Sequence, residues 1–77
     1  MIEELERVAL TVDLPEYRLV AGDMGTVVDI TPKREQYTVE FLTLDGETFA
    51  LVPVAPSQIR RIGSQEIAHA RNLETAA

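Results

Sequence analysis

The strongest structural signal in this sequence is the run Ala21-Gly22-Asp23-Met24-Gly25-Thr26-Val27-Val28-Asp29-Ile30, in which a turn bracketed by two glycines leads into β-branched residues. Glycine allows a positive φ or a close approach to another strand, and the Thr-Val-Val-x-Ile pattern favours an extended conformation. The run therefore predicts a small β-barrel, and it says nothing about an activity.

Runs of alternating or β-branched residues extend this prediction to five strands. They cover residues 7–12, 26–30, 37–41, 48–52 and 59–62. The clearest alternation places Tyr37, Val39 and Phe41 on one face of a central strand. Pro53 follows the fourth strand, and because proline lacks a backbone donor, this strand is expected to end at a sheet edge or a bulge.

Two connections have recognisable chemistry. Asp45-Gly46 predicts a tight hairpin between the third and fourth strands, because such a turn needs a positive φ that this pair supplies. The connection over 13–23 is long, and its Leu14, Tyr17 and Leu19 are expected to fold over one end of the barrel.

These elements predict an all-β fold, namely a small five-stranded SH3-like barrel formed by residues 1–63, with one turn of 3₁₀ helix over 55–58. An OB-fold is the main competing architecture. It would normally place a helix between the third and fourth strands, where this chain has only Asp45-Gly46.

The tail over 64–77 differs in character from the barrel. It contains good helix formers after a possible Ser64 cap, and its apolar residues recur at helical spacing, so we predict a short helix from Ser64 to Glu74. So short a helix is marginal in water. The tail is therefore expected either to dock through Ile67 and Leu73 or to fray.

Composition restricts the classes of function. The chain has 77 residues, which form one domain, and no cysteine, which excludes disulfides and thiolate metal sites. Its net charge of −6 opposes contact with nucleic-acid phosphates or anionic lipid. The acidic residues either serve solubility or form a face that meets a basic partner protein. No apolar run is long enough to span a bilayer, and the first residues are acidic, so we expect no membrane association and a cytoplasmic location.

No constellation of side chains predicts catalysis. The only imidazole is that of His69, which lies in the tail without an orienting partner. Asp13, Glu16 and Asp23 share the long connection, but their wide spacing indicates loop capping or solvation rather than a metal site. Gly22-x-x-Gly25 lacks the lysine and the helix of a phosphate-binding loop. We therefore expect no enzymatic activity, no cofactor and no metal.

Positive charge is concentrated at few places. The residues concerned are Arg60, Arg61, Lys33 and Arg34. They either pair with nearby carboxylates on a solvated edge or form a patch for nucleic acid. A nucleic-acid site would normally add exposed aromatic residues, whereas the aromatic residues of the predicted strands, Phe49 among them, occupy expected core positions.

Several short motifs, taken in order, carry a family resemblance. They are Val8-Ala9-Leu10, Asp13-Leu14-Pro15-Glu16, Leu19-x-x-Gly22-Asp23-x-Gly25-Thr26-Val27-Val28, Tyr37-x-Val39-Glu40-Phe41, Gly46-x-Thr48-x-Ala50 and Gln58. From Glu6 to Ile62 the chain resembles the small bacterial proteins of the domain-of-unknown-function family numbered 4926. The resemblance implies an SH3-like fold, no established enzymatic activity, and a gene beside that of a second small protein, as in a two-gene toxin–antitoxin or immunity module.

Two functions from different classes follow. The first is a non-enzymatic interaction module, the acidic antitoxin-like or immunity-like half of such a pair, which binds a basic protein encoded nearby. Its candidate contact residues are Leu14, Glu16, Tyr17, Arg60 and Arg61, with the sheet edge at Pro53. The second is a nucleic-acid or ribosome-associated module, because Gly22-x-x-Gly25-x-Val27 is similar to the KOW element of ribosomal and transcription-elongation proteins. The acidic residues around this motif depart from that element's positive charge, so nucleic acid is the weaker expectation.

Overall fold

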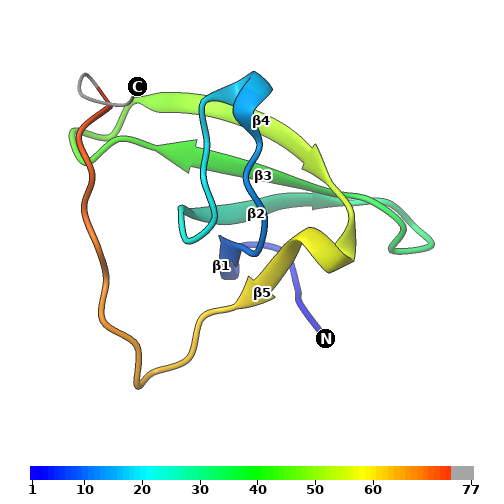
Figure 1. Ribbon diagram of the computed structural model, residues 1–77. Helices are drawn as coiled ribbons and strands as arrows, with labels where there is room; N and C mark the ends of the chain where they lie inside the picture. Colours follow the sequence, from blue (N-terminus) through cyan, green and yellow to red (C-terminus); the bar gives the residue numbers. More distant parts are fainter. Residues whose placement is uncertain (74–77) are drawn as a thin grey trace.

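The computed structural model describes residues 1–73 and contains one antiparallel sheet of five strands (Figure 1). The strands are β1 (Arg7–Leu10), β2 (Met24–Ile30), β3 (Tyr37–Leu42), β4 (Thr48–Val54) and β5 (Ile59–Arg61), with single 3₁₀ turns η1 (Pro15–Tyr17) and η2 (Pro56–Gln58). Their order across the sheet is β4-β3-β2-β1-β5, so β4 and β5 are its edge strands. The all-β, SH3-like arrangement predicted from the sequence is confirmed, and so are its five strands and the turn of 3₁₀ helix before the last one.

Gly22, just before β2, and Gly25, within it, have the two different roles that the sequence allowed. Gly22 has a φ of 95°, a backbone conformation that residues with a Cβ adopt only with strain. Gly25 lies against β3, where an added Cβ would be 2.5 Å from Val39 Cγ1 and 2.9 Å from the carbonyl oxygen of Glu40. The first glycine therefore makes the turn, and the second allows β2 and β3 to approach.

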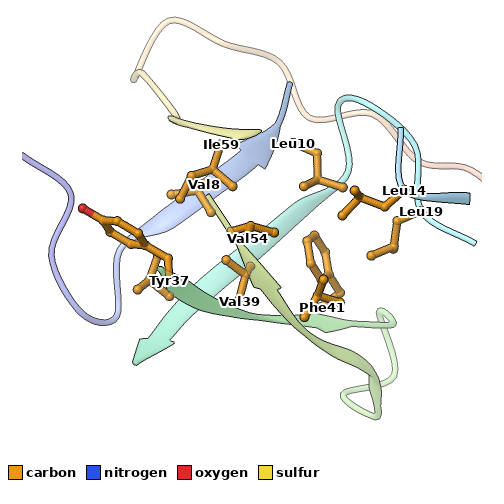
Figure 2. Close-up of a cluster of buried hydrophobic side chains, with 11 residues drawn as sticks. Val8, Leu10, Leu14, Leu19, Tyr37, Val39, Phe41, Val54 and Ile59 are labelled. Carbon is orange, nitrogen blue, oxygen red and sulfur yellow. The ribbon is translucent and has the colours of Figure 1, made fainter. Parts of the chain in front are cut away.

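The core lies between the curved halves of the sheet (Figure 2). Its buried residues are Val8, Leu10, Leu14, Leu19, Val27, Tyr37, Val39, Phe41, Val52, Val54 and Ile59. Val27, Val39 and Val52 are in register across three strands and fully buried, so this row points inward. Figure 2 shows Tyr37 at one end of the cluster and Leu14 with Leu19 at the other.

The first loop, residues 11–23, closes that second end of the barrel. Leu14 and Leu19 exchange backbone hydrogen bonds of 2.9 and 3.1 Å and are both buried, as expected. Tyr17 does not join them, since 36% of it stays exposed on η1. Arg18 ends η1 in the left-handed region, with a φ of 60°, and this conformation turns the chain back toward Leu19.

Pro53 lies at a sheet edge, as predicted, because β4 pairs only with β3 in the described sheet. The strand does not stop there: it continues to Val54, which pairs with Tyr37 and is buried. An edge strand tolerates proline where its missing donor would face away from the neighbouring strand.

The helix predicted from Ser64 to Glu74 is wrong for the residues that the structure describes, and Glu74 lies outside them. After a turn at residues 64–65, the chain to Leu73 is irregular and extended rather than helical. Ile67, which was expected to dock, is 96% exposed. A helix this short needs tertiary packing of its apolar face, and without that packing the polar contacts of the segment determine its path. In Figure 1 it leaves β5 and runs along the outside toward the hairpin between β3 and β4.

Candidate functional site

A groove of about 890 Å³ lies between the barrel and the C-terminal segment, a name used here for residues 64–73. Its barrel side comes from the first loop, the start of β2, the end of β3, the hairpin and the start of β4. The lining residues are Leu19, Asp23, Met24, Phe41, Leu42, Thr43, Leu44, Phe49 and residues 68–73. The groove therefore joins three parts of the chain that are far apart in sequence.

Arg71 anchors the C-terminal segment to the first loop. Its Nε donates to Asp23 Oδ1 at 2.9 Å and its Nη2 donates to Asp23 Oδ2 at 2.7 Å. Nη2 also donates to the carbonyl oxygen of Arg18 at 2.9 Å. The two charged side chains are only 24% and 18% exposed, so this is the most protected ion pair among the described residues.

Asp23 is held in place by the loop itself. The backbone N–H of Val20 donates to Asp23 Oδ2 at 2.9 Å, and the N–H of Asp23 donates to the Val20 carbonyl at 3.0 Å. Partial burial raises the pKa of Asp23, but hydrogen bonds from Arg71 and from Val20 outweigh it, so the net pKa lies below the usual 3.8. The hydrogen bond to Asp23 raises the pKa of Arg71. Both partners are therefore charged at neutral pH.

Arg18 makes a second contact with the C-terminal segment. Its Nη2 donates to the carbonyl oxygen of Leu73 at 3.3 Å. Its guanidinium carbon lies 5.7 Å from the centroid of the Phe49 ring, within the range of a cation–π interaction. Phe49 is partly buried against the core rather than within it, so this aromatic residue is available at the groove.

The hairpin presents apolar side chains on a fixed turn. Gly46 has the predicted positive φ, 89°, and the N–H groups of Gly46 and Thr43 close the turn by hydrogen bonds of 2.9 Å. The Thr43 hydroxyl donates to Asp45, and this bond lowers the pKa of the Asp45 carboxyl. Leu44 is 99% exposed at the tip and Leu42 is half exposed. Because these leucines expose apolar surface to solvent, they are candidates for contact with another molecule.

A cross-strand row of side chains lies on the outer face of the sheet, with Glu40 as its charged member. Thr26, Glu40 and Leu51 are opposite one another across β2, β3 and β4, and they alternate with the buried valine row. They therefore face outward. Leu51 is 57% exposed, and Glu40 accepts a hydrogen bond of 2.7 Å from Thr48.

The contact residues predicted in the first loop differ in their exposure to solvent. Leu14 does not offer the contact surface predicted for it. It is buried in the core, with 8% exposed, because it pairs with Leu19 to close the barrel. Glu16 is exposed on η1, and Tyr17 is partly exposed beside it. These two remain candidates near the end of the molecule that carries the groove.

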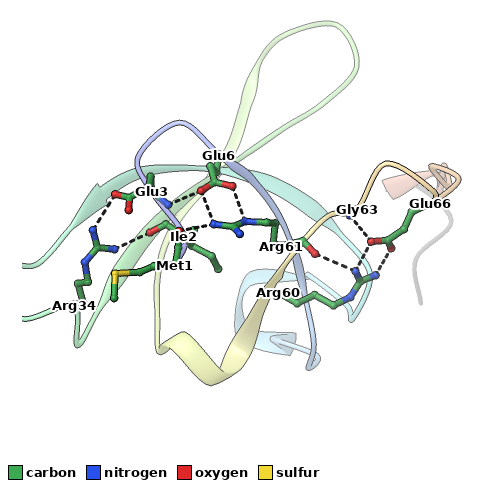
Figure 3. Close-up of polar contacts among 9 residues, drawn as sticks. All are labelled: Met1, Ile2, Glu3, Glu6, Arg34, Arg60, Arg61, Gly63 and Glu66. Carbon is green, nitrogen blue, oxygen red and sulfur yellow. Dashed lines mark hydrogen bonds and ion pairs between the residues drawn. The ribbon is translucent and has the colours of Figure 1, made fainter.

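Arg60 and Arg61 lie at β5, away from η1 in Figure 1, so the structure does not bring the five predicted contact residues together. Arg60 donates to both oxygens of Glu66 at 2.7 and 2.8 Å. Arg61 donates to Glu6 at 2.8 and 3.0 Å and to the Met1 carbonyl (Figure 3).

These contacts favour ion pairing over a basic patch. Arg34 behaves in the same way, donating to Glu3 at 2.9 Å and to the Ile2 carbonyl at 2.8 Å. Among residues 1–73, the basic side chains without an ion pair are Arg7, Arg18 and Lys33. In the same range the carboxylates without an ion pair are Glu4, Asp13, Glu16, Asp29, Glu35, Glu40, Asp45 and Glu47. The surface left for a partner is thus acidic, which gives the nucleic-acid hypothesis no support.

The groove shows no catalytic constellation in the described residues. His69 lines it, but this imidazole is exposed on the extended segment. Asp13 caps the first loop by accepting from the Ala21 N–H at 2.8 Å, the structural role that the sequence allowed. Residues 1–73 contain no group of three potential metal-ligating side chains close enough to hold an ion. They also contain no helix with the length and apolar character required to cross a membrane.

The sequence did not predict the ion pair between Asp23 and Arg71, or the contacts of Arg18 with the C-terminal segment. Asp23 and Arg71 are 48 residues apart, and no periodicity links them. The one available signal was that Arg71 is the only Lys or Arg after Arg61. A lone cation in a short tail beside an acidic barrel is a reasonable candidate for an intramolecular ion pair.

A known protein family matches the part of the chain that forms the sheet. Residues 4–61 match the profile of the family described as Domain of unknown function (DUF4926). Comparisons with curated proteins and with solved structures gave no match. The matched range includes all five strands, the first loop with Asp23, and the hairpin, and it ends before the C-terminal segment. Because the match covers well over half of the chain, this protein belongs to the DUF4926 family.

Proposed function

We propose that this protein is a non-enzymatic interaction module that binds a basic protein through the groove and its acidic rim. The observation that carries the proposal is the combination at one end of the barrel: exposed Leu42 and Leu44 line the groove, and Glu40, Asp45 and Glu47 flank them without an ion pair in the described residues. An apolar centre with a charged rim is the usual arrangement of a protein–protein interface.

The two kinds of residue would contribute differently. Burial of a fully exposed leucine such as Leu44 stabilises a complex by about 1.5–3 kcal/mol. The carboxylates would contribute less to affinity and more to the association rate and to the choice of a basic partner, because surface charges steer encounters. A partner that matches this surface carries apolar side chains among lysines or arginines.

The genetic setting implied by the family resemblance makes the product of a neighbouring gene the first partner to test. In this proposal the protein is the acidic, neutralising member of a two-gene module of the toxin–antitoxin or immunity type, and it acts in the cytoplasm. Its net charge of −6 suits that role, since the member that it neutralises would be basic.

Co-expression with the neighbouring gene product, followed by affinity purification, tests the proposal. We expect the two proteins to purify together, and Leu44→Asp to abolish this by placing a charge at the centre of the interface. Leu5→Asp is the matched control, because Leu5 is also largely exposed, at 77%, does not line the groove, and has a φ of 70° that aspartate tolerates. Two proteins that elute independently, or an unaffected Leu44→Asp variant, would overturn it.

A further inference from the structure

We propose that Asp23 and the Arg18 carbonyl form a recognition site for an arginine in an extended segment of the partner. In the free protein this site is occupied by Arg71 of the C-terminal segment, which therefore competes with the partner. The inference rests on the proposed function, because it names the chemistry and the regulation of the same groove. The name "arginine site" is used below for the acceptors on Asp23 and Arg18.

The arginine site matches a guanidinium rather than any cation. Both oxygens of Asp23 accept from two different nitrogens of Arg71, and the Arg18 carbonyl accepts a third hydrogen bond. A planar guanidinium reaches these acceptors at once, whereas a lysine ammonium is a point donor without that fork geometry. The chain itself thus shows which side chain the site accepts.

The site is built by the barrel and does not depend on the C-terminal segment for its shape. The N–H of Gly22 donates to the Leu10 carbonyl at 2.9 Å, which fixes the end of the first loop on β1. The reciprocal hydrogen bonds between Asp23 and Val20 then orient the carboxylate. All of these residues lie within the family match, and Arg71 lies outside it. An arginine from another chain would find the same acceptors.

The C-terminal segment is attached in a way that permits exchange. Residues 67–70 are exposed, and Ile67 buries almost none of its side chain. Its contacts with the first loop include polar ones: Arg71 donates to Asp23 and to the Arg18 carbonyl, and the Leu73 carbonyl accepts from Arg18. A partner segment that carries an arginine can replace these hydrogen bonds one for one and add burial of Leu42 and Leu44 in the groove.

A competitor in the same chain has a large effect because the tether gives it a high effective concentration near the arginine site. A short tether holds Arg71 at an effective concentration of roughly millimolar or more near its site. Arg71 therefore occupies its site in most molecules when the intrinsic dissociation constant lies below this concentration, and we expect that to be the case. Removal of the Arg71 side chain is expected to tighten the binding of an external arginine segment, which is the opposite of what loss of a supporting residue would do.

A labelled peptide with the sequence of residues 67–73, Ile-Ala-His-Ala-Arg-Asn-Leu, serves as the probe in fluorescence anisotropy. We expect the full-length Arg71→Ala variant to bind it roughly tenfold more tightly than the unchanged protein. Arg7→Ala is the matched control, since it removes the same charge from an exposed residue on β1 that has no ion pair in residues 1–73. It is expected to bind like the unchanged protein.

The peptide and the site are then changed separately. On the Arg71→Ala background, replacing the peptide arginine with lysine or glutamine, or changing Asp23 to Asn, should weaken binding at least tenfold. Binding that is equal for the unchanged protein and Arg71→Ala, absent in Arg71→Ala at roughly millimolar peptide, or indifferent to the peptide arginine would refute the inference. The peptide substitutions leave the protein unaltered, so they remain decisive even where Asp23→Asn unfolds the loop.

Partner capture separates the two proposals. A partner that is lost with Leu44→Asp but retained with Asp23→Asn, in a folded variant, binds the hairpin without using the arginine site. That result would reject the arginine site and leave the proposed function in place. A neighbouring gene product that never co-purifies would reject the proposed function, while the peptide experiment still reports on the site.

Discussion

Gly25 in β2 lies so close to the side chain of Val39 in β3, which is paired with Val27, that no side chain fits between them: a Cβ at position 25 would lie 2.5 Å from Val39 Cγ1. The carbonyl oxygen of Glu40, which is backbone and does not yield, would lie at 2.9 Å. The two strands therefore approach closely just after the turn that precedes β2. Changes in this region bear on both the core and the groove.

Gly25→Ala is expected to lower the free energy of unfolding by about 3 kcal/mol, because the new methyl group overpacks a fully buried row. Gly22→Ala meets no atom within 4 Å and should cost about 1 kcal/mol through its positive φ alone. Urea unfolding of the two variants measures the difference. Equal losses would contradict the distinct roles assigned to the two glycines.

Leu44→Asp should leave the free energy of unfolding within about 0.5 kcal/mol of its original value, because the side chain is 99% exposed. Phe41→Ala, at the neighbouring end of β3, should cost about 3–5 kcal/mol because it empties a core position that is only 3% exposed. Thermal or urea unfolding checks both. A large loss for Leu44→Asp would mean that the hairpin tip packs in solution and is not free for a partner.

Arg71→Ala should raise the pKa of Asp23. Burial, which raises this pKa, would remain, while the largest opposing contribution, the hydrogen bond from Arg71, would be gone. Because the folded pKa is depressed, the stabilisation from this ion pair is fully present above the usual value of 3.8 and is lost as pH falls through the folded pKa. Carboxyl NMR titration of Asp23 measures the shift, and Arg7→Ala should not change it.

A double-mutant cycle of Asp23→Asn and Arg71→Ala should give a coupling free energy of about 1 kcal/mol, at the upper end for pairs near the surface, because both side chains are mostly shielded. The readout is the protection of the C-terminal segment in NMR or hydrogen exchange, together with global unfolding. A coupling indistinguishable from zero would show that the pair does not hold the segment.

The carboxyl of Glu66 should titrate far below its ordinary range. Hydrogen bonds from Arg60 and from the Gly63 N–H lower its pKa from 4.5 to about 2. The contribution of this pair to the turn after β5 is therefore complete above pH 4.5 and disappears as pH falls toward about 2. Arg60→Ala should raise the pKa of Glu66 in an NMR titration. Arg61→Ala, which removes a neighbouring cation that pairs with Glu6, should have a much smaller effect.

Local chemistry was enough to predict the barrel. Gly22 and Gly46 have the positive φ values that their turns required, and alternation along β3 placed Tyr37, Val39 and Phe41 inside. These features depend on steric limits of single residues and on the two-residue period of a strand, both of which are visible in sequence. The family resemblance over the barrel agreed with them and was confirmed by the match over 4–61.

The contents of the groove depended on tertiary structure. The tail pattern favoured a helix, yet the segment is extended, because Arg71 pairs with Asp23 while Ile67 packs against no apolar surface. Arg61 pairs with Glu6 from the other end of the chain, and Leu14 is buried rather than exposed. Side-chain propensities act over a few residues, whereas an ion pair between positions 23 and 71 exists only after the fold has brought them together. The sequence therefore determined which strands form, and the folded chain determined which charges meet and which apolar residues stay open to a partner.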